Sequence, residues 1–205
     1  MSTPIIHVVD DDLSFRTAVT RLLRAAKYEV RGYASAAEFL DSDSCAAPGC
    51  ILLDLRMSGA SGLDLQQVLA QTEQRLPIIF LTGQGDIPAS VSAMKAGAVD
   101  FLTKPVSREA LLSAVKNALD VDAKGRAARA VLRELRDRYE NLTPREREVL
   151  VHVVGGKLNK QIASDLGAAE RTIKAHRAAI MEKLRVQSLA ELVRLAQELD
   201  IQPLK

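Results

Sequence analysis

The sequence predicts an α/β domain with a doubly wound, five-stranded parallel sheet, followed by a smaller all-α domain of four helices. Three observations support this prediction. In residues 1–120, short apolar runs alternate five times with segments of helical period. The runs are apolar throughout, as in parallel strands covered on both faces, and after Thr143 only helical periodicity remains. Repeated strand–helix order with short connections implies right-handed crossovers, which give this architecture.

Each expected strand is a short run rich in Val, Ile or Leu. The strands span residues 4–9, 28–33, 50–54, 77–81 and 100–103. Apolar residues at helical spacing predict helices between them at 13–26, 35–41, 62–73, 87–96 and 107–119. Asp12 directly precedes the first of these helices and is expected to be its N-cap.

The helical pattern continues from residue 107 to about 140, but Gly125 and its charged neighbours interrupt it. We therefore expect a first domain over residues 1–120 and a helical linker over 121–141, broken near Lys124–Gly125. A flexible linker is the alternative. Thr143 and Glu146 flank Pro144 in the pattern of a capped helix start, which opens the second domain, residues 142–205.

The second domain is expected to consist of helices at 144–154, 159–166, 170–184 and 188–199. The middle two are joined by a few residues that include Gly167, which gives them the proportions of a helix-turn-helix. In the later helix of this pair, Ile173, Ile180 and Leu184 form the apolar stripe. The last helix carries more apolar surface than a small core needs, so it is a candidate for pairing two domains.

Composition and charge narrow the class of protein. No apolar run approaches the roughly 20 residues that span a bilayer, and no secretory signal is visible, so we expect a cytoplasmic protein without a membrane partner. Cys45 and Cys50 are expected to be a loop thiol and a buried thiol. Residues 1–120 hold 11 basic and 14 acidic side chains, and residues 121–205 hold 17 and 12. This asymmetry fits a sensor attached to a nucleic-acid binder, although solvated surfaces can differ as much.

Chemically distinctive side chains end or directly follow four of the expected strands: Asp10 and Asp11, then Asp54, Thr82 and Lys104. Sites in doubly wound sheets form outside the carboxyl ends of the strands, so we expect these side chains to converge. Crowded carboxylates call for a cation, and magnesium prefers oxygen ligands. The set therefore suits magnesium-dependent phosphoryl transfer to an aspartate. Taken singly, each residue has a simpler interpretation as a helix cap, a turn residue or a solvated lysine.

Several motifs resemble those of a known family. In the first part they are V-V-D-D-D (8–12), L-L-D-L-R-M-S-G (52–59), L-T-G (81–83) and L-T-K-P (102–105). In the second they are L-T-P-R-E-R-E-V-L (142–150), N-K-Q-I-A (159–163) and R-T-I-K-A-H-R (171–177). The first set resembles the flavodoxin-like receiver domain of two-component response regulators, and the second resembles the LuxR-type helix-turn-helix. With G-D-I-P (85–88) and M-K-A-G-A-V-D-F-L (94–102), the chain is similar to FixJ-type regulators of the NarL/FixJ group.

The resemblance implies a role for each residue of the strand-end set. Asp54 is then the phosphoacceptor, supplied by a sensor histidine kinase. Asp11 and Asp54 coordinate Mg²⁺ with the backbone carbonyl of Arg56, while Asp10 acts mostly through water. Lys104 and the Thr82 hydroxyl contact the phosphoryl oxygens. Thr82 and Phe101 form a switch that moves the loop at 83–86 and the helix at 87–96.

The resemblance also implies surfaces for other molecules. Phosphorylation is expected to produce a homodimer through Ile87, Val91, Lys95 and Val99. DNA is expected to meet the helix at 170–184 through Arg171, Lys174, Ala175, Arg177 and Ala178, and its phosphates to meet Lys157, Asn159 and Lys160. RNA polymerase is a further expected partner. A basic helix face is more often only solvated, and the apolar residues of the dimer face could simply pack onto the sheet.

The chain departs from the family pattern at three places. Ser58 replaces the proline usual after the acceptor, which would loosen that loop. Ala169 stands where a capping serine is common, although Glu170 favours the helix dipole. Lys174 and Ala178 differ from other members, so no operator sequence can be carried over.

Two other classes of protein compete with a regulator. A small magnesium-dependent phosphatase or phosphotransferase also uses an aspartyl phosphate, but it usually places nucleophile and acid on one D-x-D loop. Here Asp54 lies a strand away from the acid pair, and no G-x-x-x-x-G-K-[ST] loop is present for nucleotide hydrolysis. The other rival is a DNA-binding protein with a vestigial receiver. The complete set of acids, threonine and lysine argues against it.

Overall fold

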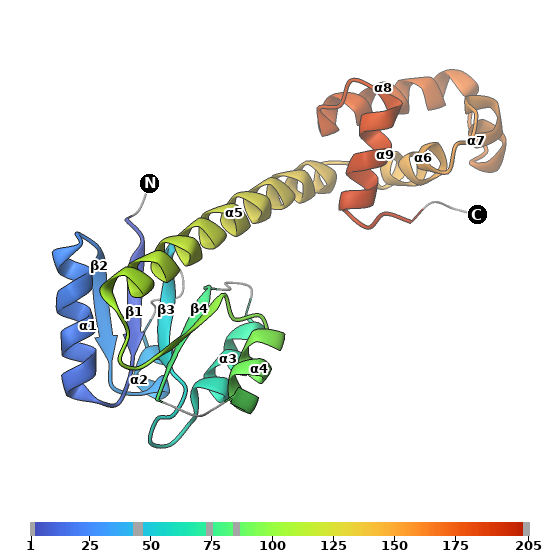
Figure 1. Ribbon diagram of the computed structural model, residues 1–205. Helices are drawn as coiled ribbons and strands as arrows, with labels where there is room; N and C mark the ends of the chain where they lie inside the picture. Colours follow the sequence, from blue (N-terminus) through green and yellow to red (C-terminus); the bar gives the residue numbers. More distant parts are fainter. Residues whose placement is uncertain (1–2, 43–46, 73–75, 84–86, 203–205) are drawn as a thin grey trace. The chain divides into compact units, whose positions relative to one another are not determined.

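A computed structural model describes residues 3–42, 47–72, 76–83 and 87–202, with the side chains of residues 87 and 88 left out. The chain divides into two compact units, residues 1–126 and 127–205. Each unit is described by itself. The first contains a sheet with helices on both faces, and the second contains only helices among its described residues (Figure 1).

The sheet of the first unit has five parallel strands in the order β2-β1-β3-β4-β5. They are β1 (Ile5–Val9), β2 (Glu29–Tyr33), β3 (Gly49–Asp54), β4 (Ile78–Thr82) and β5 (Asp100–Thr103). The predicted architecture is confirmed, and every strand begins and ends within a residue of its predicted position. Every residue of β1, β3 and β4 is buried, which explains why these runs are apolar throughout instead of alternating.

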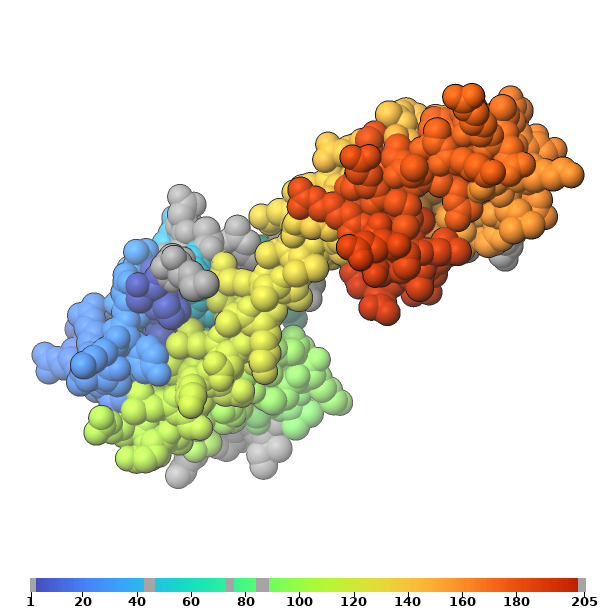
Figure 2. Space-filling model, turned by 90° about the horizontal axis from the view of Figure 1, so that it is seen from above, coloured from blue at the N-terminus to red at the C-terminus, as the bar shows by residue number. Residues whose placement is uncertain are grey.

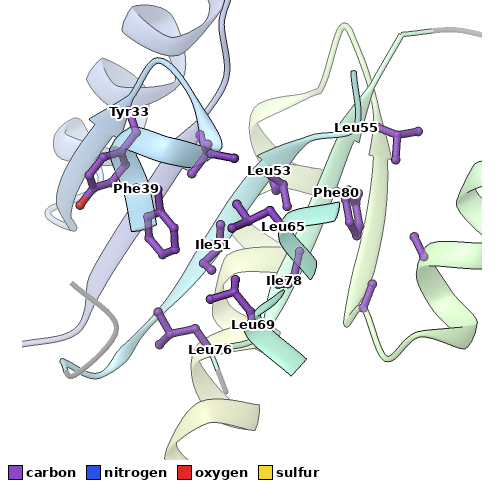
Figure 3. Close-up of a cluster of buried hydrophobic side chains, with 14 residues drawn as sticks. Tyr33, Phe39, Ile51, Leu53, Leu55, Leu65, Leu69, Leu76, Ile78 and Phe80 are labelled. Carbon is purple, nitrogen blue, oxygen red and sulfur yellow. The ribbon is translucent and has the colours of Figure 1, made fainter. Parts of the chain in front are cut away.

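Helices cover both faces of this sheet. They are α1 (Leu13–Ala25), α2 (Ala36–Leu40), α3 (Gly62–Ala70), α4 (Ile87–Lys95) and α5 (Arg108–Glu140). One core cluster joins the sheet to α1 and α5 through residues such as Leu23 and Val115. The other joins it to α2, α3 and α4, where Phe39, Leu65 and Phe80 are almost fully buried (Figure 3). The strand-end residues are therefore fixed by a core on each side.

Two glycines allow the backbone to approach closely near the ends of β3. A Cβ on Gly49 would lie 1.9 Å from the carbonyl oxygen of Ile5, and one on Gly62 would lie 2.4 Å from that of Asp54. Any other residue would push these segments apart. Gly62 thus lets α3 begin directly beside the last residue of β3.

Helix α5 continues through Gly125 without the predicted break. Residues 121–126, which the sequence assigns to the linker, belong to the first compact unit. Asp122 among them is buried against the start of β3. Its carboxylate accepts a hydrogen bond from the Gly49 amide at 2.9 Å. The same carboxylate forms an ion pair with Arg126 at 2.8 Å. The Arg126 guanidinium also donates to the carbonyl of Ala47. Packing against a distant strand is not visible in helical periodicity, so the boundary at residue 120 stays a prediction.

The imidazole of His7 is enclosed in the middle of the sheet. Its Nδ1 lies 3.2 Å from the Tyr33 hydroxyl, its ring packs edge-on against Phe39 with centroids 5.4 Å apart, and its Nε2 has no hydrogen-bond partner among the described residues. Burial, with a smaller contribution from the charge of Arg31, lowers the pKa of His7 to about 4. The folded protein therefore holds this side chain neutral.

Acidification is expected to weaken the first unit through His7. The unfolded chain takes up a proton near the ordinary pKa of 6.5 and the folded chain only near 4, so stability is lost as the pH falls through this window, by up to about 3 kcal/mol. Urea denaturation at pH 7 and pH 4.5 measures the loss. His7→Phe removes the proton site, so it should lose less stability between these pH values than the wild type. Equal losses would contradict this origin.

The second unit holds the end of α5 and four further helices: α6 (Pro144–Val154), α7 (Asn159–Asp165), α8 (Glu170–Leu184) and α9 (Leu189–Glu198). Thr143 and Glu146 form the predicted capping box at α6. The predicted stripe of α8 is confirmed, since Ile173, Ile180 and Leu184 are at most 1% exposed. Leu135 and Tyr139, from the end of α5, pack against the same core.

The apolar face of α9 is largely absorbed by this core. Leu192, Leu195 and Ala196 are buried, while Leu189 is 47% exposed. The last part of the second unit, which includes α9, forms one continuous part of the surface in Figure 2 (red). The sequence overestimated the apolar surface left over, because the end of α5 enlarges the core that these residues fill.

Two smaller predictions concern single residues. Cys50 is a buried thiol near the start of β3, as predicted, and burial raises its pKa to about 12; Cys45 lies outside the described residues. No helix in the described part of the chain combines the length and apolar character needed to cross a membrane.

Candidate functional site

The carboxyl ends of β1 and β3 bring three carboxylates together. Val9 pairs with Leu53 in the sheet, so the residues that follow, Asp10 and Asp54, lie side by side. Oxygen atoms of Asp10, Asp11 and Asp54 all lie within 4.8 Å of one another. Asp10 is fully buried, Asp54 is almost so, and Asp11 is exposed. The cluster is therefore open to solvent on the side of Asp11.

The ammonium group of Lys104 closes the other side of the cluster. Its Nζ lies 2.7 Å from Asp10 Oδ2 and 3.0 Å from Asp54 Oδ2. The same Nζ lies 4.2 Å from the centroid of the Phe15 ring, close enough for a cation–π interaction. Lys104 follows β5, and its amide donates to the Thr82 carbonyl at 2.6 Å, so the end of β4 helps to fix its position.

Burial and charge act against each other in this site. Burial, reinforced by the charge of Asp54, raises the pKa of Asp10, although Lys104 opposes the shift. Burial alone would lower the pKa of Lys104, but its bonds to Asp10 and Asp54 outweigh it and raise the pKa. The lysine therefore stays charged at neutral pH. Two carboxylates that share one ammonium leave net negative charge at the site, which favours a further cation.

Asp11 is held by the loop that follows β3. The Ser58 amide donates to Asp11 Oδ2 at 2.8 Å, and this bond is the main reason that the pKa of Asp11 is lowered. The expectation that Ser58 loosens the loop is wrong at this contact, because the amide ties the loop to the site. A proline has no N–H group and could not make this bond.

Threonine and aromatic residues complete the sheet edge. Thr82 ends β4 and is 2% exposed, in register with Thr103 of β5. Phe101 is half-buried and packs against the core that contains Phe80. The Arg56 amide donates to Asp54 Oδ1 at 3.3 Å. The switch assigned to Thr82 and Phe101 stays a prediction, and residues 84–86 of its loop lie outside the described residues.

Two site residues were missed in the sequence. Phe15 lies in the first turn of α1, where an aromatic residue is ordinarily interpreted as part of the core. Ser58 contributes mainly through its backbone amide, and its hydroxyl makes a smaller contribution. A backbone amide leaves no trace in the residue type except that the residue is not proline. The available signal was the absence of the usual proline at position 58. In the sequence this absence suggests a looser loop, whereas in the structure the Ser58 amide ties the loop to Asp11.

The carboxylate cluster fits a magnesium ion in its donor chemistry. Mg²⁺ takes oxygen ligands and is usually bound through one or two carboxylates, keeping several waters. The cluster supplies three carboxylates, and exposure of Asp11 leaves room for bound water. Lys104 neutralises part of the charge, so a divalent ion would balance the remainder.

The predicted DNA-contacting residues of α8 differ in their exposure. Four of them are exposed: Arg171, Lys174, Ala175 and Ala178. Lys174 lies 3.5 Å from Glu170 in a solvent-exposed pair. Arg177 is half-buried, and its guanidinium donates to the Asn159 side chain at 3.0 Å. The first four thus remain available to a ligand, whereas Arg177 joins α8 to the start of α7.

The other predicted DNA contacts surround the start of α7. Lys160 is exposed, and Lys157 forms an ion pair with Asp165 at 2.6 Å. Ala169 provides no side-chain cap for α8, as the sequence predicts, and Glu170 lies in the first turn instead. The turn between α7 and α8 contains Gly167 at φ +59°, a conformation that favours glycine.

The predicted dimer face is partly visible. Val91 and Lys95 are exposed on α4, and Val91 is 48% exposed. Val99 is half-buried and packs against the sheet core. Ile87 begins α4, but its side chain lies outside the described residues.

Comparisons with known proteins match both units. Residues 6–116 match the response regulator receiver domain, and residues 140–196 match the bacterial regulatory proteins of the luxR family. Nodulation protein W of Bradyrhizobium diazoefficiens is 46% identical over 197 residues, which are 96% of this chain and 87% of that protein. Response regulator protein TodT of Pseudomonas putida is 43% identical, over 95% of this chain and 86% of its own.

Solved structures agree with these relatives. The response regulator StyR is 45% identical with a TM-score of 0.83, covering 96% of this chain and all of that one. Full-length FixJ from B. japonicum is 36% identical with a TM-score of 0.60, covering 98% of this chain and 99% of that one.

A parallel sheet with an acidic edge, joined to a helix-turn-helix, defines a two-component response regulator that binds DNA. The chain belongs to the response regulators with a receiver domain and a LuxR-family helix-turn-helix, like FixJ, and it is a transcriptional regulator and not an enzyme.

Proposed function

We propose that this regulator is switched by phosphorylation of Asp54 in the presence of Mg²⁺. The observation that carries the proposal is the Lys104 ammonium held between Asp10 and Asp54, at 2.7 and 3.0 Å, beside the open carboxylate of Asp11. One cation and three acids at a sheet edge suit the capture of a phosphoryl group.

Each residue has a distinct part in this reaction. A carboxylate oxygen of Asp54 attacks the phosphorus of a phosphohistidine on a sensor kinase, and the bond from phosphorus to the imidazole nitrogen breaks, leaving the histidine on the kinase. Asp10, Asp11, Asp54 and the Arg56 carbonyl would hold Mg²⁺, which offsets charge on the phosphoryl oxygens when bound. Lys104 then leaves its carboxylate partners for a phosphoryl oxygen. The Thr82 hydroxyl donates to another.

Acetyl phosphate tests the acceptor directly. With Mg²⁺ the full chain should gain one phosphoryl group, seen by intact mass, that survives acid and is lost in alkali. Asp54→Asn should gain none. Asp12→Asn is the matched control, because asparagine also caps a helix and Asp12 only caps α1. Modification that persists in Asp54→Asn, or is absent from the wild type, refutes the proposal.

The acyl phosphate adds charge where Thr82 and Phe101 can respond, and we infer that the response is dimerisation of receivers. The exposed residues Val91 and Lys95 support a dimer face on α4, with Ile87 and Val99 beside them. Two helix-turn-helix units would then bind adjacent half-sites. In this scheme the receiver takes residues 1–120, the linker 121–141 and the DNA-binding domain 142–205. The protein acts in the cytoplasm, where a sensor kinase and RNA polymerase are its partners.

Two lysines should affect DNA binding in different ways. Lys174→Ala should change the preferred sequence, at about 1–3 kcal/mol for the base it reads, because its exposed ammonium can bridge a guanine edge. Lys160→Ala should weaken binding to every sequence alike and reduce the salt dependence by about one counterion, as expected for a phosphate contact. Selection from random DNA, followed by titration at several salt concentrations, separates the two.

The exposed Lys116 of α5 in the first unit is the matched control, since Lys116→Ala removes the same charge far from the helix-turn-helix in sequence. A footprint and preferred sequence that are unchanged by both Lys174→Ala and Lys160→Ala would refute the assignment of α8 and the start of α7 as the DNA-binding surface.

A further inference from the structure

The loop between β3 and α3 is fixed at both of its ends. The Leu55 amide donates to the Leu81 carbonyl at 2.9 Å, and the Gly62 amide donates to the Leu55 carbonyl at 3.1 Å. Ser61 caps α3 through a reciprocal pair of bonds with Asp64. Between these anchors the chain runs outward through residues 56–60, and most of it is exposed. Because both ends of the loop are fixed, a group in its outer part is held at a defined position relative to the end of β3.

Ser58 makes that contact with the acidic site. Its amide donates to Asp11 Oδ2 at 2.8 Å, across 47 residues of sequence. Asp10 is enclosed by the sheet and bonded to Lys104, whereas the side chain of Asp11 is exposed and needs another restraint to keep one orientation. The Ser58 amide supplies such a restraint.

We propose that the Ser58 amide is a positioning group for Mg²⁺, which orients the Asp11 carboxylate before the ion binds. The inference rests on the proposed function, in which Asp11 is a ligand. A carboxylate offers about four lone-pair sites, so one amide bond leaves others free for a cation. Fixing the side chain in advance removes part of the ordering cost that binding would otherwise carry. A chain with proline at position 58 lacks this restraint, since proline has no N–H.

Two substitutions at the same position separate the amide from the side chain. Ser58→Ala removes the hydroxyl, which makes the smaller of the two Ser58 contributions at Asp11, and keeps the N–H, so its Mg²⁺ affinity should stay within about twofold of the wild type. Ser58→Pro removes the N–H and should weaken Mg²⁺ binding about three- to tenfold, the effect expected for one hydrogen bond to a charged group at an exposed site. Calorimetric titration of the unphosphorylated full chain with MgCl₂ measures both, without any dependence on phosphorylation.

A second measurement does not require the proline variant to fold. Hydrogen exchange of the Ser58 amide, followed by NMR in the full chain, should be slow in the wild type and markedly faster in Asp11→Ala, which removes the acceptor. Asp12→Ala is the control, because its carboxylate accepts from Ser14 and Phe15 and not from Ser58.

The outcomes distinguish this inference from the function on which it rests. If the wild type binds Mg²⁺ and Ser58→Pro binds it as tightly as Ser58→Ala, the positioning role is overturned and the phosphoacceptor proposal stands. Exchange at Ser58 that is unchanged in Asp11→Ala also overturns the positioning role. If the wild type binds no Mg²⁺ at all, the proposed function itself fails.

Discussion

Lys104→Met is expected to suppress phosphoryl uptake at Asp54 and to destabilise the first unit by about 2–4 kcal/mol at neutral pH, near the lower end of the cost of breaking a buried ion pair. Lys104 Nζ bonds to both Asp10 and Asp54, and Asp10 is fully buried. Methionine fills a similar volume but leaves that carboxylate without its counter-charge. The partial exposure of Lys104 allows water to replace some of the lost interaction, which limits the cost.

The pH dependence of this variant follows from Asp10. Its pKa is already raised by burial, so the folded state favours the protonated acid and loses stability as the pH rises through that pKa. Removing Lys104 takes away a contact that opposes the shift, so the loss should grow. The defect of Lys104→Met should therefore be large at pH 7 and small in acid. Magnesium should restore part of the stability at pH 7, because it supplies positive charge to the same carboxylates.

Hydrogen exchange of β1 and β3 in increasing urea measures the stability of the first unit alone, and acetyl phosphate labelling measures uptake. Lys116→Met removes an exposed lysine from α5 and should behave like the wild type in both assays. A Lys104→Met protein that keeps wild-type stability at pH 7 would show that the ion pair contributes little. One that is labelled at the wild-type rate would remove Lys104 from the reaction.

The sequence predicted the sheet edge well because strand ends are easy to read. A continuous apolar run that stops at Asp54 marks both the buried strand and the point where its chain leaves the core. Parallel topology then places Asp10 beside Asp54, as the register of Val9 with Leu53 confirms. This part of the site can be predicted from residue type, strand ends and sheet topology. The first two are local in sequence, and the topology follows from simple rules.

Other contacts could not be predicted because they join residues that are distant in sequence, and some of them use backbone groups that every residue has. The Ser58 amide meets Asp11 only after β1 and β3 have paired. The guanidinium of Arg177, a predicted DNA contact, bonds to the side chain of Asn159 at the start of α7. In the sequence, Asp122 is interpreted as part of a charged linker. In the structure it is buried, with only 3% of its surface exposed. Helical periodicity tells which residues share a face, but not what lies against that face.

Asp122→Ala is expected to cost about 3–4 kcal/mol in the first unit, as for a buried ion pair that loses one partner. The change leaves the buried Gly49 amide without the acceptor at 2.9 Å and Arg126 without its carboxylate partner. An unsatisfied buried amide carries a desolvation cost, and the loss of the carboxylate removes the ion pair with Arg126. Asp120→Ala on the same helix is the matched control, because Asp120 is exposed and its loss should be within about 0.5 kcal/mol of neutral.

Asp122→Ala should also have a local effect, because Asp122 anchors one segment of α5 to the start of β3. This local effect can be distinguished from a general loss of stability. β3 runs from Gly49, which holds Asp122, to Asp54, the proposed phosphoacceptor. Loss of the anchor should speed hydrogen exchange in α5 from about residue 119 to 126, while β1 and β4 remain protected under native conditions. Because the acidic cluster lies at the other end of the strand, Asp54 should still accept a phosphoryl group. Unchanged exchange in α5 would show that this helix segment is held by its own hydrogen bonds and not by the start of β3.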